Sequence, residues 1–188
     1  MALAAGAAPL AWPKERCAIV DLEENCSLRE SLAGYRSALP GAQVWRREPP
    51  VSRAAIVPAA TRVSAWMPGF VREGGQLLLE AGWGFCGQRE MESEFGVHVH
   101  QPIDLWERDR EHGYLPYVDY RWPVPAKVRD FSRVVPVENA GAFGWIGDRP
   151  VALRRRIGRG TLTFLGSPLG PILLSGDSDG RKLLGALL

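Results

Sequence analysis

Apolar residues in the first hundred positions form short runs separated by segments of helical periodicity. The runs at 17–22, 43–45, 54–57 and 76–80 predict strands, and Pro58 ends the third of them. The run at 76–80 is almost entirely apolar, as expected for a strand that is covered on both faces.

Between these runs, apolar residues three or four positions apart predict three helices, each closed by glycine. The first begins with an S-x-x-E capping box, in which a hydroxyl and a carboxylate each satisfy a free backbone N–H. The residues that define the three helices are Ser27, Glu30, Leu28, Leu32, Tyr35 and Leu39 for the first, Ser64, Trp66, Phe70 and Val71 for the second, and Met91 and Phe95 for the third.

This alternation predicts an α/β fold with a doubly wound, mostly parallel sheet and helices on both faces. Right-handed crossovers bring the carboxyl ends of the strands to one edge, where such folds bind ligands. A ligand site is therefore expected at that edge.

The second half of the chain has a different pattern. Residues 101–136 are rich in aromatic residues and proline, which predicts an irregular insertion that packs on the sheet edge or covers the pocket. Strands at 142–146, 151–157 and 161–165 follow around glycine-containing turns and predict a C-terminal β-hairpin extension. A glycine-rich loop at 166–170 and a leucine-rich terminal helix complete the chain.

Composition supports one globular domain over 1–188. The chain has 188 residues, of which 46% are hydrophobic and 23% charged, and a net charge of +2. These values exclude a disordered tail or a collagen-like repeat, and they give no electrostatic reason to expect nucleic acid or a membrane as partner. Residues 1–14 are expected to form a loose arm, with a trimmed signal-peptide remnant over 1–12 as the alternative.

Cysteine usage favours the cytoplasm. The three cysteines, Cys17, Cys26 and Cys86, are too few and too irregularly spaced for a disulfide framework or a zinc finger. No cofactor is expected, because the glycine-rich loop at 166–170 lacks the lysine of a phosphate-binding loop.

The order of these segments resembles the class I glutamine amidotransferase-like superfamily, including its ThuA-like members, and the resemblance implies a flavodoxin-like sheet. Three segments carry the likeness: the strand and turn at 55–60, the helix, Gly-Gly and strand at 70–80, and the late hairpin at 150–166. In that superfamily they supply an oxyanion-hole N–H, the strand before a cysteine nucleophile, and the approach to a catalytic His-x-Glu.

The catalytic residues that the resemblance implies are missing. The nucleophile position corresponds to Ala81, which has no attacking atom, and the 166–172 loop contains neither histidine nor glutamate. The main hypothesis is therefore a pseudoenzyme, a non-catalytic amidotransferase-like domain that holds a small polar ligand or a protein partner at the old active-site edge. The sequence leaves open whether the chain is an enzyme, and the missing catalytic residues favour a non-catalytic role.

Polar and aromatic side chains at the expected ligand edge are the binding candidates. Glu80 is the strongest, because it ends the fourth strand there. A solvated turn is the alternative for the acids after the first strand, and a surface ion pair is the alternative for the arginine. The full set is Asp21, Glu23, Ala60, Thr61, Arg62, Glu80, Ala81 and Trp83.

Two further hypotheses compete with the pseudoenzyme. Cys86 in Gly84-Phe-Cys86-Gly87 could act as the nucleophile of an amidohydrolase, with His98 or His100 as its base. The chain could instead be the structural subunit of a homo-oligomer. His98 and His100 also have the period-two spacing of a metal site, but an edge strand with polar residues facing water fits the pattern better, so no metal is expected.

Overall fold

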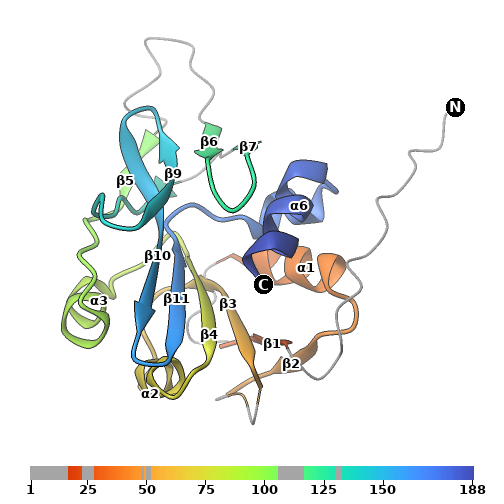
Figure 1. Ribbon diagram of the computed structural model, residues 1–188. Helices are drawn as coiled ribbons and strands as arrows, with labels where there is room; N and C mark the ends of the chain where they lie inside the picture. Colours follow the sequence, from red (N-terminus) through yellow and green to blue (C-terminus); the bar gives the residue numbers. More distant parts are fainter. Residues whose placement is uncertain (1–16, 23–27, 48, 50–51, 106–116, 130–132) are drawn as a thin grey trace, which may run out of the picture.

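The computed structural model describes residues 17–22, 28–47, 49, 52–105, 117–129 and 133–188. Nine strands form one open sheet in the order β2-β1-β3-β4-β11-β10-β9-β6-β7 (Figure 1). These strands are β1 (Cys17–Val20), β2 (Gln43–Trp45), β3 (Ala54–Ala60), β4 (Gln76–Ala81), β6 (Tyr117–Tyr120), β7 (Ala126–Arg129), β9 (Ala142–Ile146), β10 (Arg149–Ile157) and β11 (Gly160–Leu165). Two further strands, β5 (Ile103–Asp104) and β8 (Arg133–Val134), pair separately.

The sheet is mixed, which corrects the predicted mostly parallel sheet. From β2 to β11 the neighbouring strands are parallel. From β11 to β7 they are antiparallel. Periodicity identifies strands but not their neighbours, so it could not show that β6 and β7, inside the expected irregular insertion, extend the sheet. Nor could it show that β11, expected in a peripheral hairpin, pairs with β4 in the middle of the sheet.

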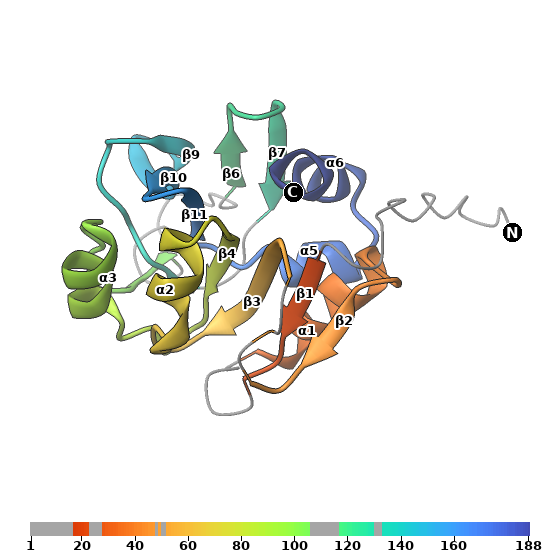
Figure 2. The same cartoon turned by 60° about the horizontal axis from the view of Figure 1, so that its bottom comes forward.

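Within the described ranges, five helices cover the two faces of the sheet (Figure 2). Strand residues alternate between two apolar clusters, as the pleat requires. Ile19 and Ile56 face the cluster that contains the buried residues of α1, α5 and α6. Val20 and Val57 face the cluster formed with α2 and α3. The helices are α1 (Arg29–Ala38), α2 (Trp66–Arg72), α3 (Gln88–Phe95), α5 (Gly170–Leu174) and α6 (Ser178–Leu187).

The helix α1 lies unusually close to the start of α5 because both carry glycine at the contact. A Cβ on Gly34 would lie 1.7 Å from the Gly170 carbonyl oxygen, and a Cβ on Gly170 would lie 2.3 Å from the Cα of Ser31. Such distances are sterically forbidden. The two glycines therefore set the approach of these helices.

The C-terminal segment contains two helices where one was predicted. Gly170–Leu174 forms the short α5, and α6 follows after Gly176, whose φ is 81°. Asp177 caps α6, because its carboxylate accepts a hydrogen bond from the Gly180 N–H at 2.7 Å. The capping aspartate explains why the helix restarts at Ser178.

Several predictions fall outside the described residues. They are the arm at 1–14, the capping residue Ser27, the candidate Glu23, Cys26, and the parts of the insertion at 106–116 and 130–132.

Candidate functional site

The buried carboxylate of Glu80 lies near the end of β4, where parallel strands present their carboxyl ends. The hydroxyl of Ser31 donates to Oε1 at 2.5 Å, and the hydroxyl of Tyr35 donates to Oε2 at 2.7 Å. Both hydroxyls come from the buried face of α1. The carboxylate therefore links the central strand to the helix that covers it.

Three backbone N–H groups complete the environment of this carboxylate. The Ala59 N–H donates to Oε1 at 3.2 Å, and the N–H groups of Leu169 and Gly170 donate to Oε2 at 2.9 and 3.0 Å. Ala59 has a φ of 42°, in the left-handed region, where β3 departs from regular register with β4. We call Glu80 with its five donors the Glu80 junction.

The structure does not place Glu80 in a ligand cleft. Its exposed fraction is 0%, both oxygens accept hydrogen bonds from the protein, and the neighbouring Ala81 is 1% exposed. Ala60 is also fully buried. The sequence correctly places these residues at the carboxyl edge of the sheet, but that edge is filled by α1 and the start of α5.

Burial also controls the protonation of the junction. Desolvation raises the pKa of Glu80 above its ordinary value, against the opposing effect of the hydrogen bonds it accepts. Burial and the adjacent Glu80 raise the pKa of Tyr35 well above its ordinary value, so the phenol keeps its proton and remains a donor.

These shifts predict a pH-dependent stability. A carboxyl pKa that is raised on folding contributes stability that is complete below the unfolded-state pKa and is lost as pH rises through the folded-state pKa. Glu80→Gln removes the titrating group. Denaturant unfolding between pH 4 and pH 8 should therefore show the stability of the wild type relative to Glu80→Gln falling as pH rises; a difference that grows with pH would contradict this sign.

The loops beyond β3 and β4 bring two other sequence candidates near each other. Both the backbone N–H and the Sγ of Cys86 donate to the carbonyl of Thr61, at 2.7 and 3.2 Å. Arg62 is exposed, Trp83 is 50% exposed, and Asp21 is half-buried beside the end of β2. None of these side chains lines the groove along α2 that is described below.

The structure gives Cys86 no imidazole partner among the described contacts. His98 and His100 follow α3 on an exposed segment, and their rings contact each other. The thiol of Cys86 donates to a carbonyl instead, so the described residues contain no hydrogen-bonded cysteine–histidine pair of the kind that activates a nucleophile. The buried Cys17 is a poor nucleophile as well, because burial raises its pKa to about 12.

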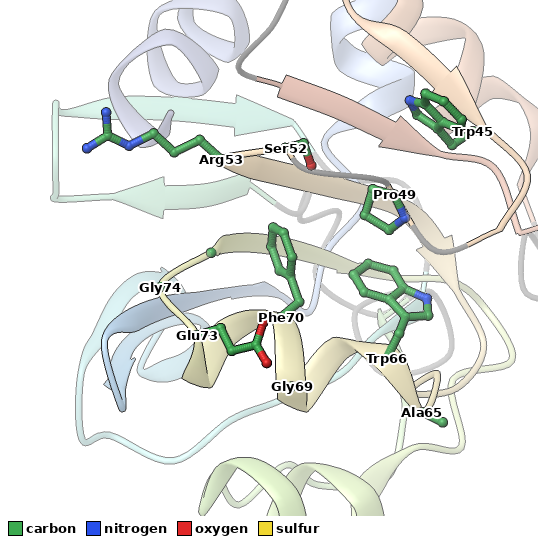
Figure 3. A pocket seen from close by; sticks show the side chains of 11 residues that line it. Trp45, Pro49, Ser52, Arg53, Ala65, Trp66, Gly69, Phe70, Glu73 and Gly74 are labelled. Carbon is green, nitrogen blue, oxygen red and sulfur yellow. The ribbon is translucent and has the colours of Figure 1, made fainter.

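Sequence reasoning missed a groove of about 810 Å³ along α2 (Figure 3). The groove lies between α2 and Pro49, with Trp45 at one end and Arg53 at the other. Its lining residues are Trp45, Pro49, Ser52, Arg53, Ala65, Trp66, Gly69, Phe70, Glu73, Gly74 and Gly75.

Aromatic rings form one wall of this groove. Trp66 and Phe70 project from the same face of α2, with ring centroids 5.7 Å apart and planes at 78°. The ring of Phe70 packs directly on Gly75, which has no side chain. A Cβ on Gly75 would lie 2.4 Å from the Phe70 ring. The four-residue spacing of Trp66 and Phe70 predicted a helix, but it could not show that both rings stay partly exposed.

Two buried polar atoms at the groove have no hydrogen-bond partner among the described residues. They are the indole Nε1 of Trp66, a donor, and the Oγ of Ser52, a donor and an acceptor. Buried polar atoms in native proteins normally have partners, so an unpaired pair beside one cavity indicates a place for ligand or solvent atoms.

The described part of the chain contains no metal site with three or more protein ligands. No group of three or more His, Cys, Asp or Glu side chains there has the arrangement of a metal site. Across the same residues, no helix combines the length and apolar character required to cross a membrane.

No protein-family model and no curated protein matches this sequence. Solved structures do share the fold. A β-galactosidase from Bacillus circulans sp. alkalophilus aligns over 92% of this chain and 31% of its own, with a TM-score of 0.60 and 14% identity. An exo-β-1,4-mannosidase from Opitutaceae bacterium strain TAV5 aligns over 85% of this chain and 31% of its own, with a TM-score of 0.62 and 17% identity.

A third neighbour matches along most of its length. A cytoplasmic protein from Salmonella typhimurium LT2 aligns over 85% of both chains, with a TM-score of 0.58 and 11% identity. By contrast, this chain spans only about 31% of the β-galactosidase and mannosidase chains. At these identities the likeness concerns the fold alone.

These neighbours correct the family expectation. The matched structures include GH42 β-galactosidases and a mannosidase, not glutamine amidotransferases, so the amidotransferase-like and flavodoxin-like assignments are wrong. The functions that followed from them, a degenerate amidotransferase and a Cys86 amidohydrolase, are withdrawn with the assignment. Self-association into a homo-oligomer stays a prediction. The error arose because short strand–turn segments recur in many α/β folds. The chain thus shares its fold with part of several glycoside hydrolases.

Proposed function

We propose that this chain binds a carbohydrate in the groove along α2. The observation that carries the proposal is the combination of Trp66, Phe70 and Trp45 with two unpaired buried polar atoms at one cavity. A small polar ligand was expected from the sequence, at a different edge of the sheet.

The aromatic residues suit the apolar faces of a sugar ring. A pyranose presents C–H groups on its faces and hydroxyls around its rim, so it packs on an indole or phenyl ring while its hydroxyls remain available. Trp66 and Phe70 stand at 78° to each other and offer two surfaces of different orientation. A cavity of about 810 Å³ accommodates a mono- or disaccharide.

Polar groups around the rings suit the hydroxyls. The Nε1–H of Trp66 can donate, the Oγ of Ser52 can both donate and accept, and the lining residue Glu73 supplies an anionic acceptor. A sugar hydroxyl can satisfy each of these groups, because it both donates and accepts.

The groove favours binding over hydrolysis. Glycoside hydrolysis normally uses two carboxylates on opposite sides of the scissile bond. Glu73 is the one acidic residue among the described lining residues. We therefore propose a binding domain and assign no glycosidase activity to this groove.

The solved neighbours lend general support. Several are β-galactosidases and one is a mannosidase, proteins whose names refer to glycosides. A cytoplasmic location is proposed on the sparse cysteines and on the neighbour described as a cytoplasmic protein.

Titration calorimetry with galactose, lactose and mannose tests the proposal. At least one sugar should bind saturably at 1:1 stoichiometry. Trp66→Ala should weaken that binding at least about tenfold, because it removes both a stacking surface and a donor. Trp66→Phe keeps a ring but lacks the N–H, so its sugar affinity should lie between those of the wild type and Trp66→Ala.

Trp83→Ala is the matched control. Trp83 is also a partly exposed tryptophan, but it does not line the groove. Its replacement should leave sugar binding unchanged. Equal loss in Trp83→Ala and Trp66→Ala, or no saturable binding of any of the sugars, would contradict the proposal.

A further inference from the structure

Two histidines lie side by side on an exposed strand-like segment after α3. Val97 and Val99 are buried, whereas His98 and His100 are exposed. This alternation puts both imidazoles on the same, solvent-facing side. Their ring centroids are 4.8 Å apart, with the planes at 89°.

The backbone that carries these rings is held on a neighbouring segment. Val99 forms an antiparallel bridge with Val137. The His100 N–H donates to the Pro136 carbonyl at 2.9 Å, and the His98 carbonyl accepts from the Glu138 N–H at 3.1 Å. Hydrogen bonds on both sides of Val99 thus fix the separation of the two histidines, so little backbone entropy remains to be lost on chelation.

We propose that His98 and His100 chelate a late first-row divalent metal ion, with Cu²⁺ bound more tightly than Ni²⁺ or Zn²⁺. Imidazole nitrogen is a common donor to these ions, and Cu²⁺ stands at the top of their affinity order. This inference is independent of the carbohydrate proposal, because the histidines do not line the groove along α2.

Among the described residues, the site has two protein ligands rather than three. Glu138 lies across the bridge from His98, but its carboxylate pairs with the Arg155 guanidinium at 3.0 Å. Arg155 is held in turn by the Gly96 carbonyl, to which its Nη1 donates at 2.5 Å. Water therefore completes the coordination, consistent with the finding that no three ligating side chains converge in the described residues.

Calorimetric titration of the untagged protein with Cu²⁺ and Ni²⁺ tests the site. One ion should bind per chain, with Cu²⁺ the tighter. His98→Ala and His100→Ala should each weaken Cu²⁺ binding about tenfold or more, because each converts a chelate into a single ligand. Electron paramagnetic resonance should show two imidazole nitrogens on Cu²⁺ in the wild type and one in either variant.

Glu30→Ala is the control, since Glu30 is an exposed carboxylate on α1, on the opposite face of the sheet from α3. It should leave affinity, stoichiometry and the spectrum unchanged. Both tested histidines are exposed, so their replacement should not alter unfolding. The proposal is overturned if wild-type protein binds no Cu²⁺ at 1:1, if Glu30→Ala costs as much as His98→Ala, or if the spectrum of either histidine variant matches the wild type.

Discussion

Glu80→Ala is expected to lower the free energy of unfolding by at least about 3 kcal/mol, because it leaves five buried donors without their acceptor. For a chain of this size that loss corresponds to a fall of about 6–12 °C in Tm. Thermal and denaturant unfolding measure both quantities. The expectation follows because a buried donor left without an acceptor costs more free energy than a formed hydrogen bond contributes.

Two variants make this test specific. Glu92→Ala removes an exposed glutamate from α3 and should change stability by no more than about 0.5 kcal/mol. Tyr35→Phe removes one donor and keeps the ring, and should cost about 1–2 kcal/mol. A Glu80→Ala protein as stable as Glu92→Ala would mean that the Glu80 junction contributes nothing to the fold.

Gly34→Ala is expected to destabilise the protein by at least about 2 kcal/mol, although alanine normally favours a helix over glycine. The added Cβ would lie 1.7 Å from the Gly170 carbonyl oxygen, so α1 must move away from α5. That movement would also stretch the hydrogen bonds from Ser31 and Tyr35 to Glu80. Equilibrium unfolding of the variant measures the combined cost.

Gly69→Ala is the matched control in another helix. Gly69 lies within α2, and apart from its chain neighbours and the backbone of that helix no atom lies within 4 Å of the position that its Cβ would occupy. It should raise the free energy of unfolding by about 0.5–1 kcal/mol, through helix propensity and the loss of unfolded-state entropy. Changes of opposite sign in the free energy of unfolding would identify the close contact between α1 and α5 as the cause of the loss in Gly34→Ala. A Gly34→Ala protein as stable as Gly69→Ala would contradict this explanation.

Elements could be predicted well where periodicity is strong. The apolar run at 76–80 became β4, and the runs at 142–146 and 151–157 became β9 and β10. Spacing within one segment reflects its own backbone geometry, so these elements need no knowledge of their neighbours.

The candidate site was predicted less well, because burial is a property of the neighbours. Glu80 was correctly placed near the carboxyl end of a central strand, yet Ser31 and Leu169, which enclose it, lie 49 and 89 residues away in sequence. The groove along α2 combines Trp45, Arg53 and Trp66 from three separate segments. No local pattern marks such a combination, and the family resemblance directed attention to the carboxyl edge of the sheet.

What the sequence determined by itself is which segments form strands and helices and which of their faces are apolar, since these depend on interactions between residues close along the chain. The tertiary structure alone decided that β11 joins β4, that α1 closes over Glu80, and that Trp66 and Phe70 border a cavity. Those outcomes depend on pairings and close approaches between distant segments, whose loop-closure entropy and steric fit are properties of the whole fold.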